Sequence, residues 1–347
     1  MIVNLVTEYR HRLGWSQQKL AECSGLSRAA ISAIETGRVI PSTAAALVLA
    51  EVFHCSVEEI FSLGKLGIQN VHWAWTPMRR VGRFWRAKVE DKVLLIPTES
   101  TVVGTLGHDG VYGPSGITVI RPLDPRKTLV IAGCDPAVAL LSEQVSAISN
   151  LRVIPLTRSS QKAIELLEKG LVHAAGLHFS SETAKADNRT VASKVMKQEF
   201  RLLRVARWEE GIVTDPSLRM RSIEAVLESD IRWVGREKGS AARECLDHVL
   251  GRWRPEGYKY QALGHHGVTE TISSGWAQAG VCVRLPAEEN GLNFLKVREE
   301  NYDLCFPVGA ESEPAIKGLL KAVRSTFYRK HLGQLPGYST DTTGDLE

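Results

Sequence analysis

The sequence predicts a multidomain protein: an all-α domain of five helices, a short β-rich connector and a two-lobe α/β domain. Three patterns support this prediction. Residues 1–64 carry apolar residues at helical spacing, residues 65–127 hold short aromatic and β-branched runs broken by Pro and Gly, and from residue 128 strand and helix patterns alternate. A chain of 347 residues is long enough for two or three domains.

The first domain is predicted from its helix caps. The expected helices are Val3 to Leu13, Gln17 to Cys23, Arg28 to Thr36, Thr43 to Phe53 and Val57 to Phe61. A serine stands before four of them as an N-cap (Ser16, Ser27, Ser42 and Ser56). Gly25 and Gly37 suit positions with positive φ, and Gly64 and Gly67 are expected to close the domain.

The segment from Ser16 to Ser42 predicts two crossed helices with one free face. Its apolar residues point one face of each helix into a shared core (Leu20, Ala21, Leu26, Ile31 and Ile34). The polar and small residues that remain outward leave a face that can enter a DNA groove. This segment, SQQKLAECSGLSRAAISAIETGRVIPS, resembles the XRE-family (phage-repressor-type) helix-turn-helix, and the resemblance covers roughly residues 3 to 64.

The resemblance implies that the domain binds double-stranded DNA, with the chain paired as a homodimer. The expected DNA-binding residues are Gln17, Ser27, Arg28, Ala29, Ser32, Ala33 and Arg38. Arg28 is the best candidate for a base contact, most naturally with guanine O6 and N7, and Ala29 can touch a thymine methyl group. Gln17, at a helix N-terminus, suits a phosphate.

Charge limits what this domain can do alone. The whole chain carries a net charge of +4, but residues 1–64 hold five Lys/Arg and six Asp/Glu. Phosphate neutralisation drives most non-specific DNA affinity, so a single copy is expected to bind weakly. The densest basic run, residues 79–88, can supplement DNA contact, although a solvated strand face is the better interpretation.

The connector, residues 65–127, is predicted to contain three or four strands. The candidate runs are VHWAW, RFWRAKV, KVLLIP and VVGTLG. This segment either joins the next domain or packs on it. Its aromatic residues form a small core or an interface, and the core is favoured (Trp73, Trp75, Phe84 and Trp85).

Residues 128–332 predict strands and helices in alternation, and therefore a parallel sheet. FRLLRVARWEEGIV is expected to be a longer strand that crosses to a second α/β lobe, and NFLKVREE and YDLCFPV a final pair of strands. One long helix is predicted from Glu313 to Tyr328. The tail, residues 333–347, is rich in Gly, Thr and Asp and is expected to be disordered.

The two-lobe segment resembles the periplasmic-binding-protein superfamily, in particular the cytoplasmic version that is fused to helix-turn-helix domains and related to molybdate-binding proteins. The residues that carry the resemblance are Gly133 to Pro136, Gly170 to His178, Arg236 to Arg243, Gly275 to Val281 and Tyr302 to Leu304. Where related proteins usually have Gly-Ser-Gly-Thr-Arg, this chain has Gly-Ser-Ala-Ala-Arg, without a hydroxyl at Ala242. The resemblance implies a small-molecule ligand, such as an oxyanion.

Ligands of open α/β sheets bind at the carboxyl ends of strands, where three strand-to-helix loops qualify. The expected ligand-binding residues are Cys134, Asp135, Arg158, Ser159, His178, Gly239, Ser240 and Arg243. Helix N-termini, hydroxyls and arginines together make anion cradles. The alternative is that the serines only cap helices and the arginines are surface residues; for Asp135 the capping role is favoured, and for His178 a packed loop position is equally plausible.

No metal site or cofactor is predicted. The six cysteines form no CxxC pair and read as reduced thiols, and His265-His266 lacks a third ligand at suitable spacing. No nucleophile elbow, phosphate loop or HExxH motif occurs, so an enzyme is not expected. Since no apolar run reaches membrane-spanning length, the protein is expected in the cytoplasm, away from membranes.

These observations together predict a ligand-responsive transcriptional regulator. Two alternatives remain open at this point: a DNA-binding partner protein whose C-terminal part serves assembly only, and an enzyme on the α/β domain.

Overall fold

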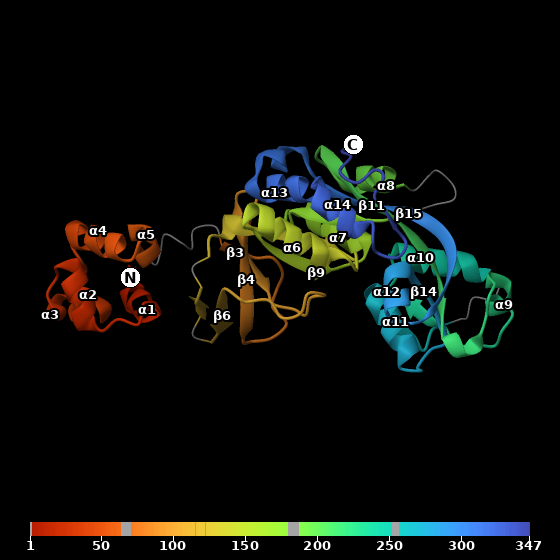
Figure 1. Ribbon diagram of the computed structural model, residues 1–347, viewed down its shortest axis with the longest axis horizontal. Helices are drawn as coiled ribbons and strands as arrows, with labels where there is room; N and C mark the ends of the chain where they lie inside the picture. The colour runs from red at the N-terminus through yellow and green to blue at the C-terminus, as the bar shows by residue number, and fades with distance from the viewer. Residues whose placement is uncertain (1, 64–70, 115, 122, 180–186, 252–256) are drawn as a thin grey trace. The chain divides into compact units, whose positions relative to one another are not determined.

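The computed structural model describes residues 2–63, 71–114, 116–121, 123–179, 187–251 and 257–347. The chain divides into two compact units, Met1–His72 and Trp73–Glu347 (Figure 1). No helix within these ranges is long and apolar enough to cross a membrane.

The first unit is the predicted bundle, closed by a small sheet. Its helices are α1 (Val6–Arg12), α2 (Gln17–Ser24), α3 (Arg28–Glu35), α4 (Thr43–Val52) and α5 (Val57–Ile60). The predicted first helix begins too early, because Ile2–Asn4 forms strand β1, which pairs antiparallel with β2 (Phe61–Leu63). Leu13, the last residue of the expected first helix, is 47% exposed. Gly64 and Gly67 lie outside the described residues.

The caps of α2 and α3 agree with the sequence prediction. The hydroxyls of Ser16 and Ser27 accept hydrogen bonds from the amides of Lys19 and Ala30, both at 3.1 Å. Gly25 ends α2 with a φ of +68°, where a side chain would be strained. The apolar faces of the helices share one core, which includes Leu20, Ile31, Ile34 and Leu49.

The connector is a sheet whose strand order is β3-β5-β4-β6-β7. Its strands are β3 (Val71–Trp73), β4 (Gly82–Val89), β5 (Lys92–Pro97), β6 (Gly110–Gly113) and β7 (Gly116–Val119). VVGTLG is not a strand, because its chain turns at the bridge between Thr101 and Gly104. Trp85 is buried in one core with Val130 and Ile154 of the α/β domain, so the connector packs on that domain.

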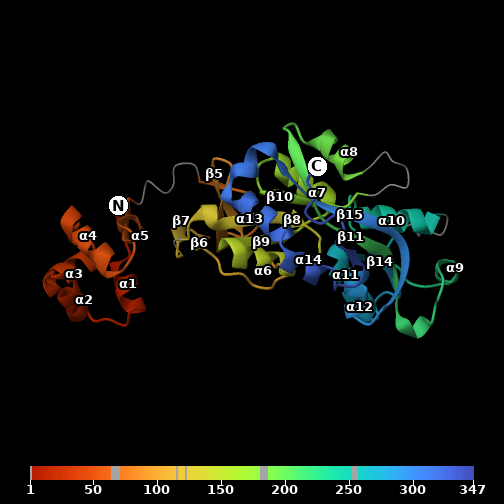
Figure 2. The ribbon, with the colours of Figure 1, turned by 45° about the horizontal axis from the view of Figure 1, so that its top comes forward.

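The first lobe contains three parallel strands among its described residues. They are β8 (Thr128–Gly133), β9 (Arg152–Thr157) and β10 (Ala174–Leu177), connected through α6 (Val138–Ser149) and α7 (Ser160–Glu168). One core joins α6 to α13 (Pro314–Val323), and another joins α7 to the connector sheet. Figure 2 shows α6 and α13 near each other, beside the strands of the first lobe. Helix α8 (Asn188–Val195) follows β10.

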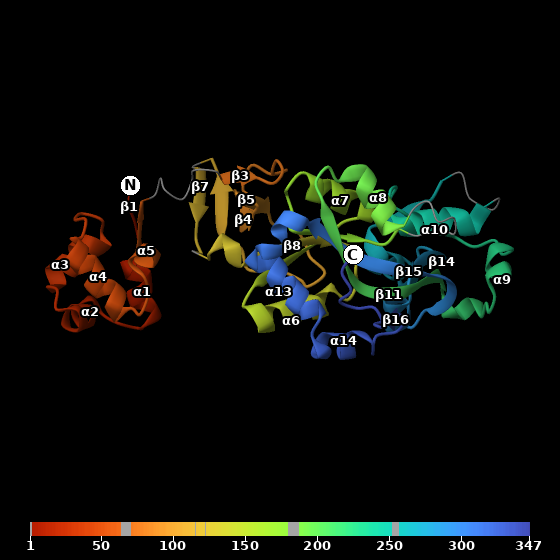
Figure 3. The ribbon, with the colours of Figure 1, turned by 90° about the horizontal axis from the view of Figure 1, so that it is seen from above.

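Two long antiparallel strands, β11 (Phe200–Thr214) and β15 (Asn293–Pro307), connect the lobes. They extend the sheet of the first lobe to β14 (Ala279–Val283) of the second, in the order β14-β11-β15-β10-β8-β9. The predicted pair NFLKVREE and YDLCFPV is therefore wrong: both belong to β15, because β11 offers backbone partners along its whole length. The sheet is also mixed and not wholly parallel, since β11 runs antiparallel to both β14 and β15, and β15 runs antiparallel to β10. Figure 3 shows β11 and β15 side by side.

The second lobe is smaller. Its elements are α9 (Ile223–Leu227), β12 (Val234–Arg236), α10 (Ala241–Leu250), β13 (Tyr260–Ala262), α11 (Gly264–Ser273), β14 and α12 (Arg284–Glu289). Strands β12 and β13 pair in parallel. Apolar side chains on two sides of β14 form the cores of this lobe, with Val268 of α11 on one side and Leu246 of α10 on the other.

The C-terminal segment differs from the prediction twice. The expected long helix is divided into α13 and α14 (Thr326–Leu332), because the hydroxyl of Ser325 accepts the amide of Tyr328 and starts a new helix. The tail is ordered: β16 (Tyr338–Ser339) pairs with β11, and Leu346 bridges to Leu203. Composition predicted disorder here, but an open edge of β11 was available for pairing.

Candidate functional site

The predicted DNA-binding residues lie on α2 and α3 or directly beside α3, since Ser27 precedes that helix and Arg38 follows it. Arg28, Ala29 and Arg38 are exposed, and Ser32 and Ala33 are half-buried. The hydroxyl of Ser27 is engaged as the cap of α3.

Gln17 differs from these residues, because its side-chain amide already donates a hydrogen bond within the first unit. Its Nε2 donates to Glu35 Oε2 at 2.7 Å, and Glu35 accepts a 2.6 Å hydrogen bond from Arg10 Nε. Burial raises the pKa of Glu35, but Arg10 and Gln17 lower it by more, so its net pKa lies below the ordinary value. This network fixes α1, α2 and α3 relative to one another.

The second unit contains a cavity of about 50 Å³ at the carboxyl ends of β8 and β9. The residues around it come from both lobes and include Cys134, Asp135, Thr157, Gly264, His265 and Tyr302. Gly264, at the start of α11, has a φ of +69°, and a Cβ there would lie 3.4 Å from the Thr157 side chain. The N-terminus of α11 is thus held against the first lobe.

Tyr302 of β15 explains two glycines of the first lobe. A Cβ at Gly133 or Gly176 would overlap the Tyr302 hydroxyl. Because this ring lies over the ends of β8 and β10 and stacks on Trp208, with ring centroids 4.6 Å apart, it forms part of the cavity wall.

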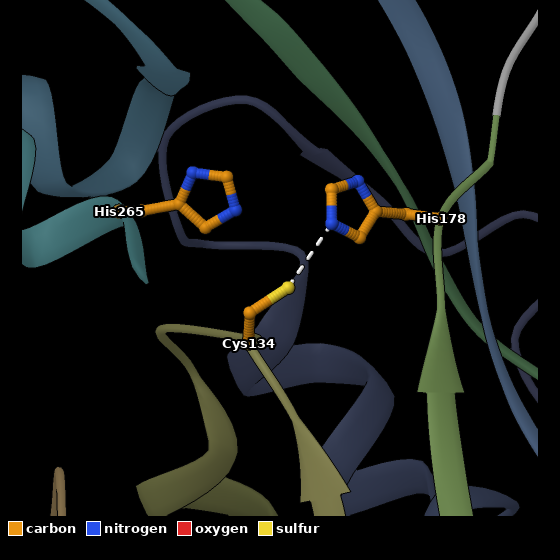
Figure 4. Close-up of side chains that lie close together, drawn as sticks. All are labelled: Cys134, His178 and His265. Atoms are coloured by element: carbon orange, nitrogen blue, oxygen red, sulfur yellow. Dashed lines mark hydrogen bonds between the residues drawn. The ribbon is translucent and has the colours of Figure 1, made fainter. Parts of the chain in front are cut away.

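Cys134 and His178, predicted separately, are brought together at the cavity. The Cys134 Sγ lies 3.0 Å from His178 Nε2, as Figure 4 shows. The opposite ring nitrogen, Nδ1, donates to Glu300 Oε2 at 2.8 Å. Burial lowers the pKa of His178, but Cys134 and Glu300 together raise it well above its ordinary value, so we assign an imidazolium. The backbone amide of His178 donates to the Ser160 hydroxyl.

His265 faces the same space from the second lobe. Its Nδ1 accepts the Val283 amide at 3.3 Å, and Arg236 Nη1 lies 3.3 Å from the same atom. Nδ1 therefore holds the lone pair and Nε2 carries the proton. Burial and then Arg236 lower the pKa of His265 well below its ordinary value, so the ring is neutral. Nε2 is buried without a partner among the described residues, and it points toward His178 and Cys134 in Figure 4.

This tautomer bears on metal binding. Ligand atoms of Cys134, His178 and His265 lie within 4.8 Å of one another, a Cys-His-His set of the kind that holds zinc. A metal needs the lone pair of His265 Nε2. The two donors at Nδ1 leave the ring proton on Nε2, so this lone pair is not available. Glu300 also holds His178 as an imidazolium. The groups therefore fit a donor-lined cavity better than a metal centre.

Asp135 is buried beside the cavity. Its Oδ1 accepts the Ala137 amide at 2.9 Å and the Tyr338 hydroxyl at 2.7 Å. The N-cap of α6 (Val138–Ser149) is Ala137 and no side chain in the described ranges caps this helix, so the predicted capping role of Asp135 is wrong; its contact with the Ala137 amide lies in the turn before the helix. Burial raises the pKa of Asp135 to about 6, despite both hydrogen bonds. Its Oδ2 is buried with no partner among the described residues.

The other predicted ligand residues lie away from this cavity. Arg158 forms a bidentate ion pair with Glu99 of the connector, both bonds at 2.8 Å, and Ser159 caps α7. Next to Gly239, which has a φ of +82°, Ser240 caps α10 and donates to the Glu237 carbonyl.

Arg243 is likewise engaged within its own lobe. Its Nε pairs with Asp247 at 2.9 Å, its Nη1 donates to the Arg236 carbonyl at 3.1 Å, and its guanidinium lies over the Tyr258 ring. Neither of the two predicted arginines lines the cavity.

Sequence reasoning missed His265, Glu300 and Tyr302. His265 was considered only with its neighbour in sequence, yet the two cavity residues that it faces, Cys134 and His178, lie far away along the chain. Glu300 and Tyr302 are on a strand, where polar residues usually face solvent. One signal was available. Glu300 and Tyr302 are two positions apart, so both side chains lie on the same face of a strand that must pass the ends of β8 and β10.

Comparisons with known proteins agree with this architecture. The helix-turn-helix family matches residues 6–60. The uncharacterized protein YvgK of Bacillus subtilis is 26% identical over 305 residues, which cover 84% of this chain and 96% of that protein. The uncharacterized HTH-type transcriptional regulator YgzD of B. subtilis is 42% identical over 60 residues (17% and 91%), and the competence pilus inhibition repressor of Acinetobacter baylyi is 45% identical over 56 residues (16% and 51%).

Two solved structures align with part of this chain at low identity. PhnD1 of Prochlorococcus marinus in complex with methylphosphonate has a TM-score of 0.45 and 13% identity, covering 62% of this chain and 92% of that one. An ABC-type phosphate transport receptor of Vibrio cholerae has a TM-score of 0.42 and 12% identity, covering 61% and 98%. The family described as the PBP superfamily domain matches residues 142–324, over half of the chain. The chain therefore belongs to the PBP superfamily domain family, with a helix-turn-helix DNA-binding domain joined to its ligand-binding domain.

Proposed function

We propose that the protein is a ligand-responsive transcriptional regulator. It binds operator DNA as a homodimer through α2 and α3, and it binds a small anion, such as the oxyanion molybdate, in the cavity between Cys134 and His265. The observation that carries the ligand half is the Nε2–H of His265, which is buried beside the start of α11 and has no hydrogen-bond partner in the described part of the chain. A buried donor of this kind has a free-energy cost until an acceptor occupies the cavity.

The surroundings of His265 favour an anion. The N-cap residue of α11, Leu263, supplies no side-chain acceptor, so the first amides of this helix are open to a ligand. His178 adds a buried imidazolium close by. A cavity of about 50 Å³ limits the ligand to a few non-hydrogen atoms.

The ligand half is tested by thermal unfolding with molybdate, tungstate, phosphate, sulfate and small carboxylates. An anion present at a hundred times its Kd should stabilise the protein by about 2.7 kcal/mol and raise Tm. His265→Phe fills the space without a donor and should abolish the shift, whereas His265→Gln retains an N–H and should keep part of it. If no anion raises Tm, or if His265→Phe responds as the wild type does, the anion site is wrong.

The DNA half depends on Arg28, which is exposed at the start of α3. Arg28→Ala should weaken operator binding by about 1–3 kcal/mol and relax the preference at one base pair. Arg12→Ala removes the same charge from α1, where the side chain is 57% exposed, and should leave the base preference intact. Footprinting and binding to single-base operator variants measure both effects; an unchanged preference in Arg28→Ala contradicts the assignment.

A further inference from the structure

We propose that Cys134, His178 and Glu300 form a relay that holds Cys134 as a thiolate, so that the cavity is a site of covalent modification by a small carbon electrophile. The anion proposal assigns no bond-forming role to this sulfur. The inference rests on the geometry of the three side chains and not on the identity of the ligand.

The first step of the argument is the order of the three groups. His178 lies between a sulfur 3.0 Å from its Nε2 and a carboxylate oxygen 2.8 Å from its Nδ1, and His178 and Glu300 are fully buried. Activated cysteine nucleophiles have this arrangement: a base within hydrogen-bonding reach, oriented by a third group. Each contact comes from a different element, since Cys134 follows β8, His178 follows β10 and Glu300 belongs to β15.

The second step is that Glu300 is held as a carboxylate. Arg298 Nη2 lies 2.5 Å from its Oε1, and Trp208 Nε1 donates to its Oε2 at 3.3 Å. Burial raises the pKa of Glu300, but His178 and Arg298 lower it by more, so its net pKa is below the ordinary value. A fixed carboxylate on Nδ1 stabilises the imidazolium of His178, which leaves Nε2–H to donate to sulfur.

The third step is the charge balance of the buried cluster. Burial and the neighbouring Glu300 raise the pKa of Glu210 to about 7, so Glu210 is partly protonated at neutral pH. With Glu210 neutral, the cations are His178 and Arg298, and Glu300 is one anion. Asp135, whose pKa is about 6, adds a second anion at neutral pH, so this charge balance applies below pH 6, where both Asp135 and Glu210 are protonated. There a thiolate at Cys134 makes the cluster neutral, which a low-dielectric interior favours over a net charge.

The fourth step is access. Cys134 lines the cavity and is 8% exposed, whereas Cys245, Cys282 and Cys305 are fully buried away from it. His265 Nε2–H faces the sulfur across the same space (Figure 4) and can stabilise negative charge on the leaving atom.

The covalent step balances without a further reactant. The lone pair of the Cys134 thiolate attacks an electrophilic carbon, the S–C bond forms, and the bond from that carbon to its leaving group breaks. The leaving group departs with the electron pair, and the proton on His178 stays in place or passes to the leaving group. No group is oxidised or reduced at the protein.

The test uses iodoacetamide on the full chain, with the exposed Cys23 as an internal reference. Mass spectrometry gives the labelling rate of each cysteine between pH 6 and 8. An ordinary thiol loses about tenfold in rate per pH unit below its pKa, whereas a thiolate does not. At pH 6 Cys134 should react on the order of tenfold or more faster than Cys23. Equal or slower labelling of Cys134 at pH 6 overturns the modification site.

The relay is tested separately from access. The ultraviolet absorbance difference between wild type and Cys134→Ser reports the thiolate directly, and it should persist at pH 6. His178→Gln and Glu300→Gln should remove it and restore the pH dependence of an ordinary thiol. Glu300→Gln also disturbs Arg298, so circular dichroism confirms folding and His178→Gln provides the second variant. Absorbance that titrates as an ordinary thiol in the wild type overturns the relay, and it leaves the anion test unaffected.

Discussion

Asp135 is the residue whose protonation should control anion binding. Its carboxyl lines the cavity, and its pKa of about 6 lies close to physiological pH, with burial as the largest cause. The groups around it are Tyr338, which donates to Oδ1, the Ala137 amide, and His178, Tyr302 and Tyr328 nearby. Tyr338 has its pKa raised well above the ordinary value by burial and then by Asp135, so it stays a neutral donor.

The expected consequence is an anion affinity that falls as pH rises through about 6. Above this pKa Asp135 is an anion and repels the ligand; below it, the neutral carboxyl can donate from Oδ2. The affinity should fall by at most tenfold per pH unit. Isothermal titration with the anion identified by thermal shift, at pH 5.5 to 8, measures this slope. Asp135→Asn keeps the acceptor Oδ1 and should flatten it; an unchanged slope in that variant excludes Asp135 as the source.

At the residue scale, the sequence predicted the loops that face the cavity better than it predicted the side chains that face it. Cys134, Asp135 and His178 follow buried strands of one sheet, so their proximity was predictable. Arg158 pairs with Glu99, 59 positions earlier, and no local pattern announces such a partner. The Ser240 hydroxyl accepts the Arg243 amide in the first turn of α10. A sequence cannot distinguish such a structural role from anion binding.

At the scale of elements, His173 joins the connector to the first lobe. Its Nδ1 accepts the Val130 amide at 3.0 Å, and its Nε2–H donates to the Lys88 carbonyl of β4 at 2.8 Å. The bond at Nδ1 requires the neutral ring, because a protonated Nδ1 cannot accept the Val130 amide. Burial lowers the pKa of His173 from 6.5 to about 4.

Acid should therefore weaken this joint. The unfolded chain takes up a proton below pH 6.5 and the folded chain only near pH 4, so stability is lost as pH falls through that window. The shift corresponds to roughly 3 kcal/mol. His173→Gln cannot titrate, and the difference in unfolding free energy between it and the wild type should narrow between pH 6.5 and pH 4. His331→Gln, on a half-exposed histidine of α14, is the control and should run parallel to the wild type in urea titrations.

Two of the elements that the sequence misassigned, the strand β15 and the C-terminal tail, share a physical reason. Helices of the first unit were predictable because caps and apolar spacing are local. The single strand β15 and the ordered tail depend on β11, which pairs with β15 along its length and with Tyr338 and Ser339 at one edge. Such pairing is non-local, and local composition argued against it in the tail.

At the scale of the whole molecule, a regulator requires that the ligand of one unit change the affinity of the other. The anion can do so only if it binds two states of the protein unequally. The cavity can provide such a difference, because its walls come from both lobes and β11 and β15 connect them. Coupling of this kind is reciprocal, so the factor by which the anion changes operator Kd must equal the factor by which operator changes anion Kd.

We expect a factor of about 5–150 in both directions. Fluorescence anisotropy with labelled operator, with and without saturating anion, gives the first factor; anion titration of the protein–operator complex gives the second. His265→Phe should lose the anion effect while keeping operator affinity in the absence of ligand, since His265 lies in the second unit and α2 and α3 in the first. An anion that binds tightly and leaves operator affinity unchanged would show that the second unit binds the ligand without controlling DNA binding. A ligand with equal affinity for both states of the protein does not shift the equilibrium between them.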